Sequence, residues 1–576
     1  MVKDIGESAA KRSGGLIQLA RCNASSNSER DAQRLLVDKL ELALDVPISF
    51  LPTGDKNLVV PLLKLRDWAK WIVDHNLWHM LSGLQQPDAK RSASQWSSFW
   101  QKFRAYSPHH TVFAKADRGE IDLSRTAGIL VHGDEGRSRR RSAIMILSWH
   151  SILGRGTGPL HRSEKGKLLR KQYAKLLPSF SGHSYTTRYL FATLTKASYT
   201  GDNAHIFDAV LDSLCADLQF MATTGVCDEW NRRYWMVLIN VCGDWPFLAK
   251  SGHLARSFSN ITKKAGASRR EPPKGICHIC RAGQEGVPYE QIQTRRPIWL
   301  QTMHEQSPFT APSPFLQLDH IPNESANIWA FDLFHSFHLG VARNFIGSVL
   351  AMYSDLEPAR NIDERFELLS ARYRSFCSQQ RLGSVLTKIT KETIQWPTTG
   401  CFPSAGWHKG AVSTVMMKWI EHRFLHEDLS EDPFLPMAGE ASVAINKAVS
   451  QMYESSVLLD PSDSAEIGGQ GMRFLRRYAE LSAAAKNDGR ALFVVMPKHH
   501  AIQKMMLTLL AKSEQGVPAV NPIALSVQQD EDFIGRPSRV SRRVTSRTPV
   551  MVRVMRRYLQ SAYRQYLEGG YLIRPT

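Results

Sequence analysis

The sequence predicts a mixed α/β (α+β) protein in which a strand-rich region lies between two helical regions. Apolar runs of strand length occur at 127–132, 143–149, 186–196 and 234–241. Apolar residues at helical spacing dominate 26–110 and the chain from 329 to about 515, apart from breaks near 395–407 and 460–471 that read as loops. The content of 43% hydrophobic and 22% charged residues is that of a globular protein, which excludes collagen-like, disordered or coiled-coil structure for most of the chain.

The N-terminal part is expected to be helical after a disordered tail at 1–25. Ser26 and Glu29 form a capping-box pattern that opens a helix to about residue 46. Five tryptophans follow on two more expected helices, 61–81 and 94–105, and they favour a packed core over a platform for stacking bases. This helical N-terminal region is assigned to 26–115.

Two of the predicted strands end close to an aspartate. The run at 127–132 precedes Asp134, and the continuously apolar run at 234–241 precedes Asp244. Strands that end at one edge of a sheet can bring such carboxylates together, and three carboxylates can hold two divalent ions about 3.5–4 Å apart, which suits phosphodiester chemistry with Mg²⁺ or Mn²⁺. The alternative is that both aspartates are ordinary turn residues.

The pair Cys277 and Cys280, in a loop region assigned to 261–328, has the spacing of thiolate ligands to zinc. His304 is the expected third ligand, and His320 or His278 could be the fourth. The alternative is a pair of incidental thiols.

Two further histidine patterns lie in the helical region assigned to 329–515. Asp332 and His335 are three residues apart, which predicts either an Asp–His pair near a metal or phosphate, or a self-satisfied polar stripe on a helix. The run 497–500 (PKHH) could face phosphate or form a surface turn.

Positive charge is concentrated in two segments. The chain has 73 Lys and Arg against 54 Asp and Glu, a net charge of +19, and residues 533–576 hold ten arginines against one acidic residue. This predicts a nucleic-acid partner, with a solvated basic face as the alternative. The arginines expected to bind nucleic acid are Arg137, Arg139, Arg140, Arg141, Arg536, Arg539, Arg542, Arg543, Arg553, Arg556 and Arg557.

The expected compartment is reducing and does not involve a membrane. No apolar stretch reaches the length of a transmembrane helix, the first residues lack the apolar core of a secretory signal, and eight cysteines are too few for a disulfide scaffold.

The order of these motifs resembles the core of CACTA-type (En/Spm-like) DNA transposases and the related KDZ group. The runs that carry the resemblance are LVHGDEGRSRRRSAIMILSW, RYWMVLINVCGDWPFLAKSGHL, GICHIC, RRPIWLQTMH and FDLFHSFHLGVARNF. It covers about 125–350, extends loosely to 497–540, and is absent from 1–110. The chain departs from the family at Gln293-Thr294, where Gly-His usually precedes the Arg-Arg pair.

The resemblance implies an RNase H-like catalytic domain of the DDE/D type, formed by 120–260 and 516–576 and split by the helical insertion. Asp134, Asp244 and Glu531 would be the catalytic carboxylates, with Asp530 and Asp532 as rivals for the third, and Asp332 with His335 would be auxiliary. The implied function is a nuclear, homo-oligomeric DNA transposase or a protein derived from one. A non-catalytic DNA-binding or chromatin protein and an RNA-processing nuclease are the alternatives.

Overall fold

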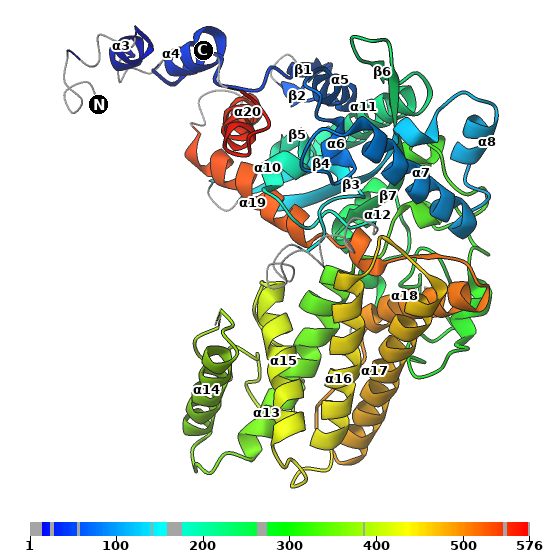
Figure 1. The fold of residues 1–576 in the computed structure, drawn as a ribbon. Coiled ribbons are helices and arrows are strands. Elements are labelled where there is room, and N and C mark those ends of the chain that lie inside the picture. The colour runs from blue at the N-terminus through cyan, green and yellow to red at the C-terminus, as the bar shows by residue number, and fades with distance from the viewer. Residues whose placement is uncertain are drawn as a thin grey trace.

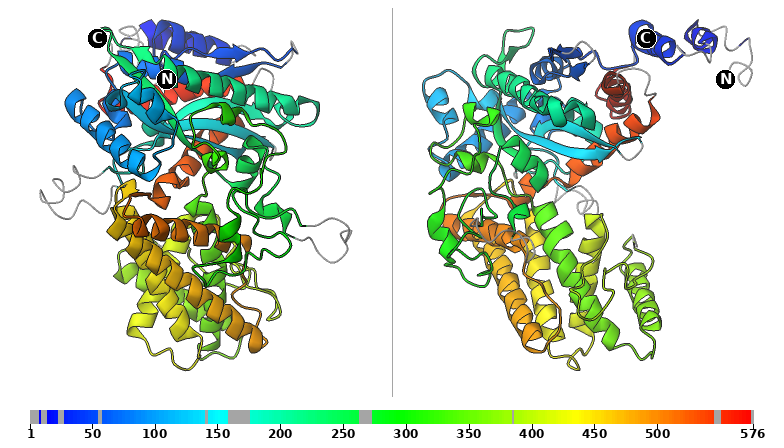
Figure 2. Two further views of the ribbon diagram at one scale, coloured as in Figure 1. Left: turned by 90° about the vertical axis from the view of Figure 1, so that its right-hand side faces the viewer. Right: turned by 180° about the vertical axis from the view of Figure 1, so that it is seen from behind.

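The computed structural model describes residues 8, 14–22, 28–54, 58–139, 142–157, 176–261, 273–383, 386–544 and 550–573. Two parts are visible in Figure 1: a sheet flanked by helices, and below it a group of long helices. Figure 2 shows the same division from two other sides.

A seven-stranded mixed sheet forms the centre of the first part, so the α/β class predicted from sequence is correct. The strand order is β1-β2-β5-β4-β3-β7-β6. Strands β3, β4 and β5 are antiparallel neighbours, whereas β7 runs parallel to β3. The strands span Ser49–Leu51 (β1), Val60–Leu62 (β2), Thr126–Arg137 (β3), Ala143–Ser151 (β4), Tyr189–Thr195 (β5), Val226–Cys227 (β6) and Arg233–Gly243 (β7).

The four predicted strands lie in β3, β4, β5 and β7, with one difference. Residues 184–187, which overlap the start of the third predicted strand, form the short helix α10. Strands β4 and β7 are buried along most of their length because helices cover both faces of the sheet (Figure 2). These helices include α11 (Ala204–Thr223), which packs on β7, and α19 (Gln528–Arg543) and α20 (Val550–Glu568), which pack on β3 and β5.

The N-terminal part differs from the expectation in two ways. Residues 14–21, expected to be disordered, form helix α3 (Gly14–Arg21), and strands β1 and β2 join the sheet instead of extending a helical region. The helix expected at 61–81 is divided into α5 (Leu65–Asp74) and α6 (Trp78–Leu81) at Asn76, whose φ of 57° is incompatible with a continuous helix. Trp68, Trp96 and Trp100 are buried, as the core interpretation predicts; the last two lie on α7 (Ala89–Tyr106).

The second part is helical, as the pattern from 329 onwards predicts. Its first helix is a π-helix, Phe334–Val341, that continues directly into α13. The other helices are α13 (Ala342–Asp355), α14 (Ile362–Gln379), α15 (Gly410–His426), α16 (Leu435–Glu454), α17 (Pro461–Asn487) and α18 (Pro497–Glu514).

The loop expected at 460–471 is wrong, because these residues begin helix α17. Pro461 occupies the first turn, where a missing N–H group is harmless. Gly468 and Gly471 face α18, and a Cβ atom added at Gly471 would lie 2.2 Å from the sulfur of Met506. The glycines therefore allow close helix packing and do not mark a turn.

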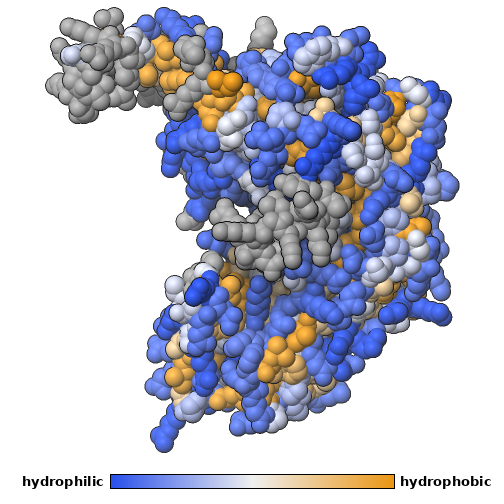
Figure 3. Space-filling model, in the orientation of Figure 1, coloured by the Kyte–Doolittle hydropathy of each residue, from blue (hydrophilic) through white to orange (hydrophobic). Residues whose placement is uncertain are grey.

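The segment 273–328 is built from turns and short 3-10 helices, and it packs between the two parts. Within the described ranges, the helices are all too short or too polar to cross a membrane. In Figure 3 the surface is hollowed between the two parts, and the upper rim of the hollow is mainly hydrophilic.

Candidate functional site

Asp134 and Asp244 lie side by side where the parallel pairing of β3 and β7 ends. Asp134 does not end its strand as predicted, because β3 continues to Arg137 and pairs Asp134 with Ile146 of β4. The parallel register of β3 and β7 pairs His132 with Cys242 and Gly133 with Gly243, so each aspartate follows a paired glycine. A Cβ atom at Gly133 would lie 2.2 Å from the ring of Phe247, which shows how closely helix α12 (Trp245–Ser251) packs here. Asp244 also accepts a hydrogen bond of 2.8 Å from the N–H of Phe247, so it caps this helix as well.

Glu531, on the first turn of α19, joins these two aspartates. Burial and the charge of Asp134 raise the pKa of Glu531 to about 8. Burial and the charge of Asp244 raise the pKa of Asp134 to about 6, while the neighbouring Glu531 carboxyl lowers it in part. Burial also raises the pKa of Asp244. Raised values are expected where buried carboxylates lie close together.

The two rivals of Glu531 face other partners. Asp530 is fully buried and lies 3.2 Å from Nε of Arg188 and 3.1 Å from Nδ1 of His150. These two groups hold the pKa of Asp530 well below its usual range, although burial alone would raise it. Asp532 accepts hydrogen bonds from Ser184 and Arg536 at 2.9 Å. Among 530–532, only Glu531 turns towards Asp134.

Asp332 and His335 lie beside this cluster of carboxylates. Asp332 precedes the π-helix and accepts hydrogen bonds from the N–H groups of Phe334 (2.9 Å) and His335 (2.7 Å). Nδ1 of His335 lies 2.6 Å from Oδ2 of Asp332, and its Nε2 lies 3.7 Å from Oε1 of Glu531. Burial lowers the pKa of His335, but the hydrogen bond and charge of Asp332 outweigh it and raise the value to about 9. His335 is therefore a cation that links Asp332 to Glu531.

Lys498 approaches the same carboxylates from α18. Its ammonium group lies 3.4 Å from the carbonyl oxygen of Leu339, and a Cβ atom at Gly340 would lie 2.5 Å from its Cδ. Its charge interacts with Asp332 and Asp244, while burial lowers its pKa. The run 497–500 is thus the buried start of a helix and not a surface turn.

Cys277 and Cys280 converge with a histidine that the sequence analysis did not assign to them. The ligand atoms of Cys277, Cys280 and His500 all lie within 4.8 Å of one another, and Nε2 of His500 is 3.5 Å from the Cys280 sulfur. Burial raises the pKa of Cys277, but its contacts with Cys280 and His500 lower it well below the usual value. This set is compatible with zinc, which favours thiolate and imidazole ligands.

The expected third ligand, His304, is not one of these three residues. It lies close by, since its N–H donates to the carbonyl of Ile279 at 2.8 Å, and its Nε2 is buried with no hydrogen-bond partner among the described residues. His278 contacts the carbonyl oxygen of Trp329 instead, and His320 that of Leu318. His304 is therefore the candidate for the fourth ligand. One feature of the sequence indicated a functional role for His500, its position in the 497–500 run.

The basic segments of β3 and α19 lie next to each other. Ser538 donates a hydrogen bond to the carbonyl of Arg137, and Ser541 donates one of 2.8 Å to Ser138. The exposed arginines of this surface are Arg137, Arg139, Arg539, Arg542 and Arg543. Arg536 pairs with Asp532 at 2.9 Å; Arg553, Arg556 and Arg557 lie on α20; Arg140 and Arg141 lie outside the described residues.

Neither comparison with known proteins returned a relative. The chain matches no protein-family model and no curated protein sequence. Any function must therefore be argued from the arrangement of the residues.

Proposed function

We propose that this protein binds DNA and cleaves or transfers phosphodiester bonds, as a transposase or a transposase-derived protein of the nucleus. The observation that carries the proposal is the approach of Asp134, Asp244 and Glu531 at one sheet edge, beside an arginine-rich surface. Three carboxylates on β3, β7 and the helix after the insertion are the arrangement expected of a DDE/D site. The strand order β5-β4-β3-β7, with β7 parallel to β3, also supports an RNase H-like domain.

The three carboxylates suit a pair of Mg²⁺ or Mn²⁺ ions. They offer oxygen ligands only, and Oε1 of Glu531 is buried with no hydrogen-bond partner among the described residues. Across the described part of the chain, the one set of acidic, histidine or cysteine ligand atoms within 4.8 Å of one another is the Cys277 set. The carboxylate oxygens of Asp134, Asp244 and Glu531 therefore do not all lie within 4.8 Å of one another. When bound, such ions would stabilise the charge of the phosphodiester transition state.

The residues around the three carboxylates would orient Glu531, bind DNA phosphates and stabilise the local structure. Asp332 holds the imidazole of His335, which in turn contacts Glu531. Arg539 and Arg542 would contact backbone phosphates, and the Lys498 ammonium would offset negative charge near the carboxylates. Zinc at Cys277, Cys280 and His500 would tie the 273–328 segment to α18.

The test is nicking of supercoiled plasmid DNA with Mg²⁺ or Mn²⁺ by single isosteric variants. Asp134→Asn, Asp244→Asn and Glu531→Gln should each lower the rate by about 100-fold or more, since each removes charge that holds the ions. Asp332→Asn should lower the rate by about 10–100-fold. Asp532→Asn, next to Glu531 but turned away, is the matched control and should change the rate little.

Two outcomes would contradict this assignment. If Asp332→Asn abolished nicking and Asp244→Asn did not, the second carboxylate would be Asp332. If the parent bound DNA but never nicked it with either metal, the protein would be a non-catalytic DNA-binding protein. A parallel assay on RNA distinguishes a ribonuclease.

A further inference from the structure

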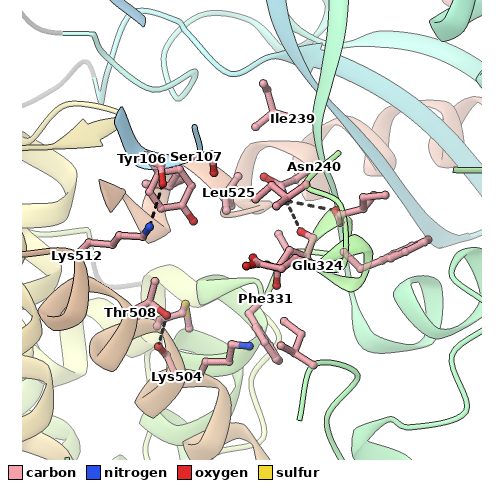
Figure 4. A pocket seen from close by; sticks show the side chains of 18 of the residues that line it. Tyr106, Ser107, Ile239, Asn240, Glu324, Phe331, Lys504, Thr508, Lys512 and Leu525 are labelled. Atoms are coloured by element: carbon pink, nitrogen blue, oxygen red, sulfur yellow. Dashed lines mark hydrogen bonds between the residues drawn. The ribbon is translucent and has the colours of Figure 1, made fainter. Parts of the chain in front are cut away.

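A cavity of about 520 Å³ lies where several segments of the chain meet (Figure 4). Its walls come from the end of α7 at Tyr106, from Asn240 on β7, from 319–331, and from α18 between Lys504 and Lys512. Asp134, Asp244, Glu531 and Asp332 do not line it. Its volume falls within the range of small-molecule sites, about 300–1,000 Å³.

The cavity is lined mainly by apolar and aromatic side chains. Tyr106, Trp299, Trp329 and Phe331 contribute rings. Trp299 and Trp329 have no exposed surface and form the packed layer behind the wall, so Tyr106 and Phe331 are the rings that present surface to the cavity. Such a lining favours a ligand with an aromatic or acyl body.

Lys504 places an ammonium group against this apolar lining. The residue is only 7% exposed, and its Nζ has no hydrogen-bond partner among the described residues. Nζ lies 5.6 Å from the centre of the Phe331 ring, and Figure 4 shows the side chain directed between Phe331 and Glu324. Burying an ammonium without an acceptor is unfavourable, and an anionic ligand group would remove that penalty.

The charged side chains around the cavity carry a net positive charge that one anionic group would neutralise. The Lys512 ammonium donates to the carbonyl of Tyr106 at 2.9 Å. Asp319 is already paired with Lys115 at 2.7 Å, which leaves Glu324 as the carboxylate that faces the two lysines. The thiolates of Cys277 and Cys280 also act on Lys504, and zinc held between them would offset their two negative charges. Lys504 and Lys512 counted against Glu324 then leave an excess of one positive charge.

We propose that this cavity binds a small amphipathic monoanion, with its apolar body among the aromatic rings and its anionic group on Lys504. Because the walls come from α7, β7 and α18, the bound molecule would link the sheet to the helical part. This site is separate from the proposed catalytic carboxylates and does not depend on them.

The experiment uses the full chain with its metal, decanoate as the probe, and decanol and decylamine as neutral and cationic analogues. Calorimetric titration should give decanoate at least about ten-fold tighter binding than either analogue, and decanoate should raise the melting temperature. Lys504→Met keeps the apolar stem and should remove the preference for decanoate. Lys418→Met, at an exposed lysine on α15, is the control and should leave it intact.

A second variant guards against misfolding of Lys504→Met. Thr508→Phe fills the cavity without touching the Lys504 ammonium, and it should abolish binding of all three probes while zinc content stays unchanged. The proposal is overturned if decanoate binds no better than decanol to the parent protein. It is also overturned if the Lys504→Met protein still binds decanoate better than decanol. A Lys504→Met protein that loses zinc but keeps its decanoate affinity would overturn it as well, because Lys504 would then serve only as the counter-charge of the Cys277 and Cys280 thiolates.

Discussion

Nδ1 of His335 lies 2.6 Å from Oδ2 of Asp332, and this contact orients the imidazole so that its other nitrogen faces Glu531. Asp332 is fixed in turn by N–H groups of the π-helix and by the N–H of Val527, 195 residues away, at 3.2 Å. One carboxylate therefore joins the sheet edge, the helical part and the segment that leads into α19.

The protonated His335 should stabilise the folded protein below neutral pH. Its pKa is raised from 6.5 to about 9, so the stabilisation is complete below pH 6.5 and is lost as the pH rises through 9. His335→Gln should lower the free energy of unfolding by about 1.5–3 kcal/mol at pH 6, with a smaller loss at pH 9.5. Urea unfolding across this range measures the difference. His426→Gln, at an exposed histidine on α15, should show no such pH dependence.

Glu531, in contrast to protonated His335, should destabilise the folded protein once it is ionised. Its pKa is raised from 4.5 to about 8, so the folded state holds an extra proton between these values, and unfolding free energy falls as the pH rises through that window. Glu531→Gln should therefore be more stable than the parent by about 1–2 kcal/mol at pH 8 in chelator. Adding Mg²⁺ or Mn²⁺ should stabilise the parent more than the variant in thermal unfolding. An equal response of both proteins would argue against ion binding at Glu531.

The metal site predicts a ranking of zinc loss. Cys277→Ser and His500→Ala should each release most of the zinc, because they remove ligands that already converge. His304→Ala should weaken zinc binding less than His500→Ala does. Zinc content by mass spectrometry after dialysis against a mild chelator gives the order, with His426→Ala as the control. Full zinc retention in His500→Ala would remove His500 from the site.

The arginines at the junction of β3 and α19 should bind phosphates. Arg539 and Arg542 are exposed there, and changing both to Gln should lower DNA affinity and reduce the salt slope of log K by about two. Arg360 and Arg476, exposed in the helical part, form the matched control pair. Fluorescence anisotropy at several salt concentrations provides the slopes. Equal effects of the two pairs would mean that the surface is only a solvated basic face.

Two glycines of α17 should respond oppositely to alanine. Gly469 has no atom within 4 Å of an added Cβ, so Gly469→Ala should stabilise the protein by about 0.5–1 kcal/mol through helix propensity. Gly471→Ala should destabilise it by about 1–3 kcal/mol, because its Cβ would lie 2.2 Å from the Met506 sulfur. Thermal unfolding of both variants tests the helix packing against α18.

Sequence patterns were most informative where a strand is buried on both faces. The apolar runs before Asp134 and Asp244 predicted strands, and both exist because their neighbours cover them on either side. Patterns were least informative where glycine was read as a turn, as at 460–471. There the close approach of α18 explains Gly468 and Gly471, and no local signal in the sequence indicates that approach.

Residue type and spacing alone identified the residues that could do chemistry: two aspartates that follow apolar runs, a pair of thiols at zinc spacing and an arginine-rich end. The tertiary structure decided which of them meet. Helix α19 turns Glu531 towards Asp134 and buries Asp530 against Arg188. The sequence of three consecutive acidic residues does not show which of them faces Asp134. Likewise, α18 brings His500 to Cys280 across 220 residues of chain. Spacing predicts contacts within one element, whereas contacts between distant elements depend on how their buried faces pack.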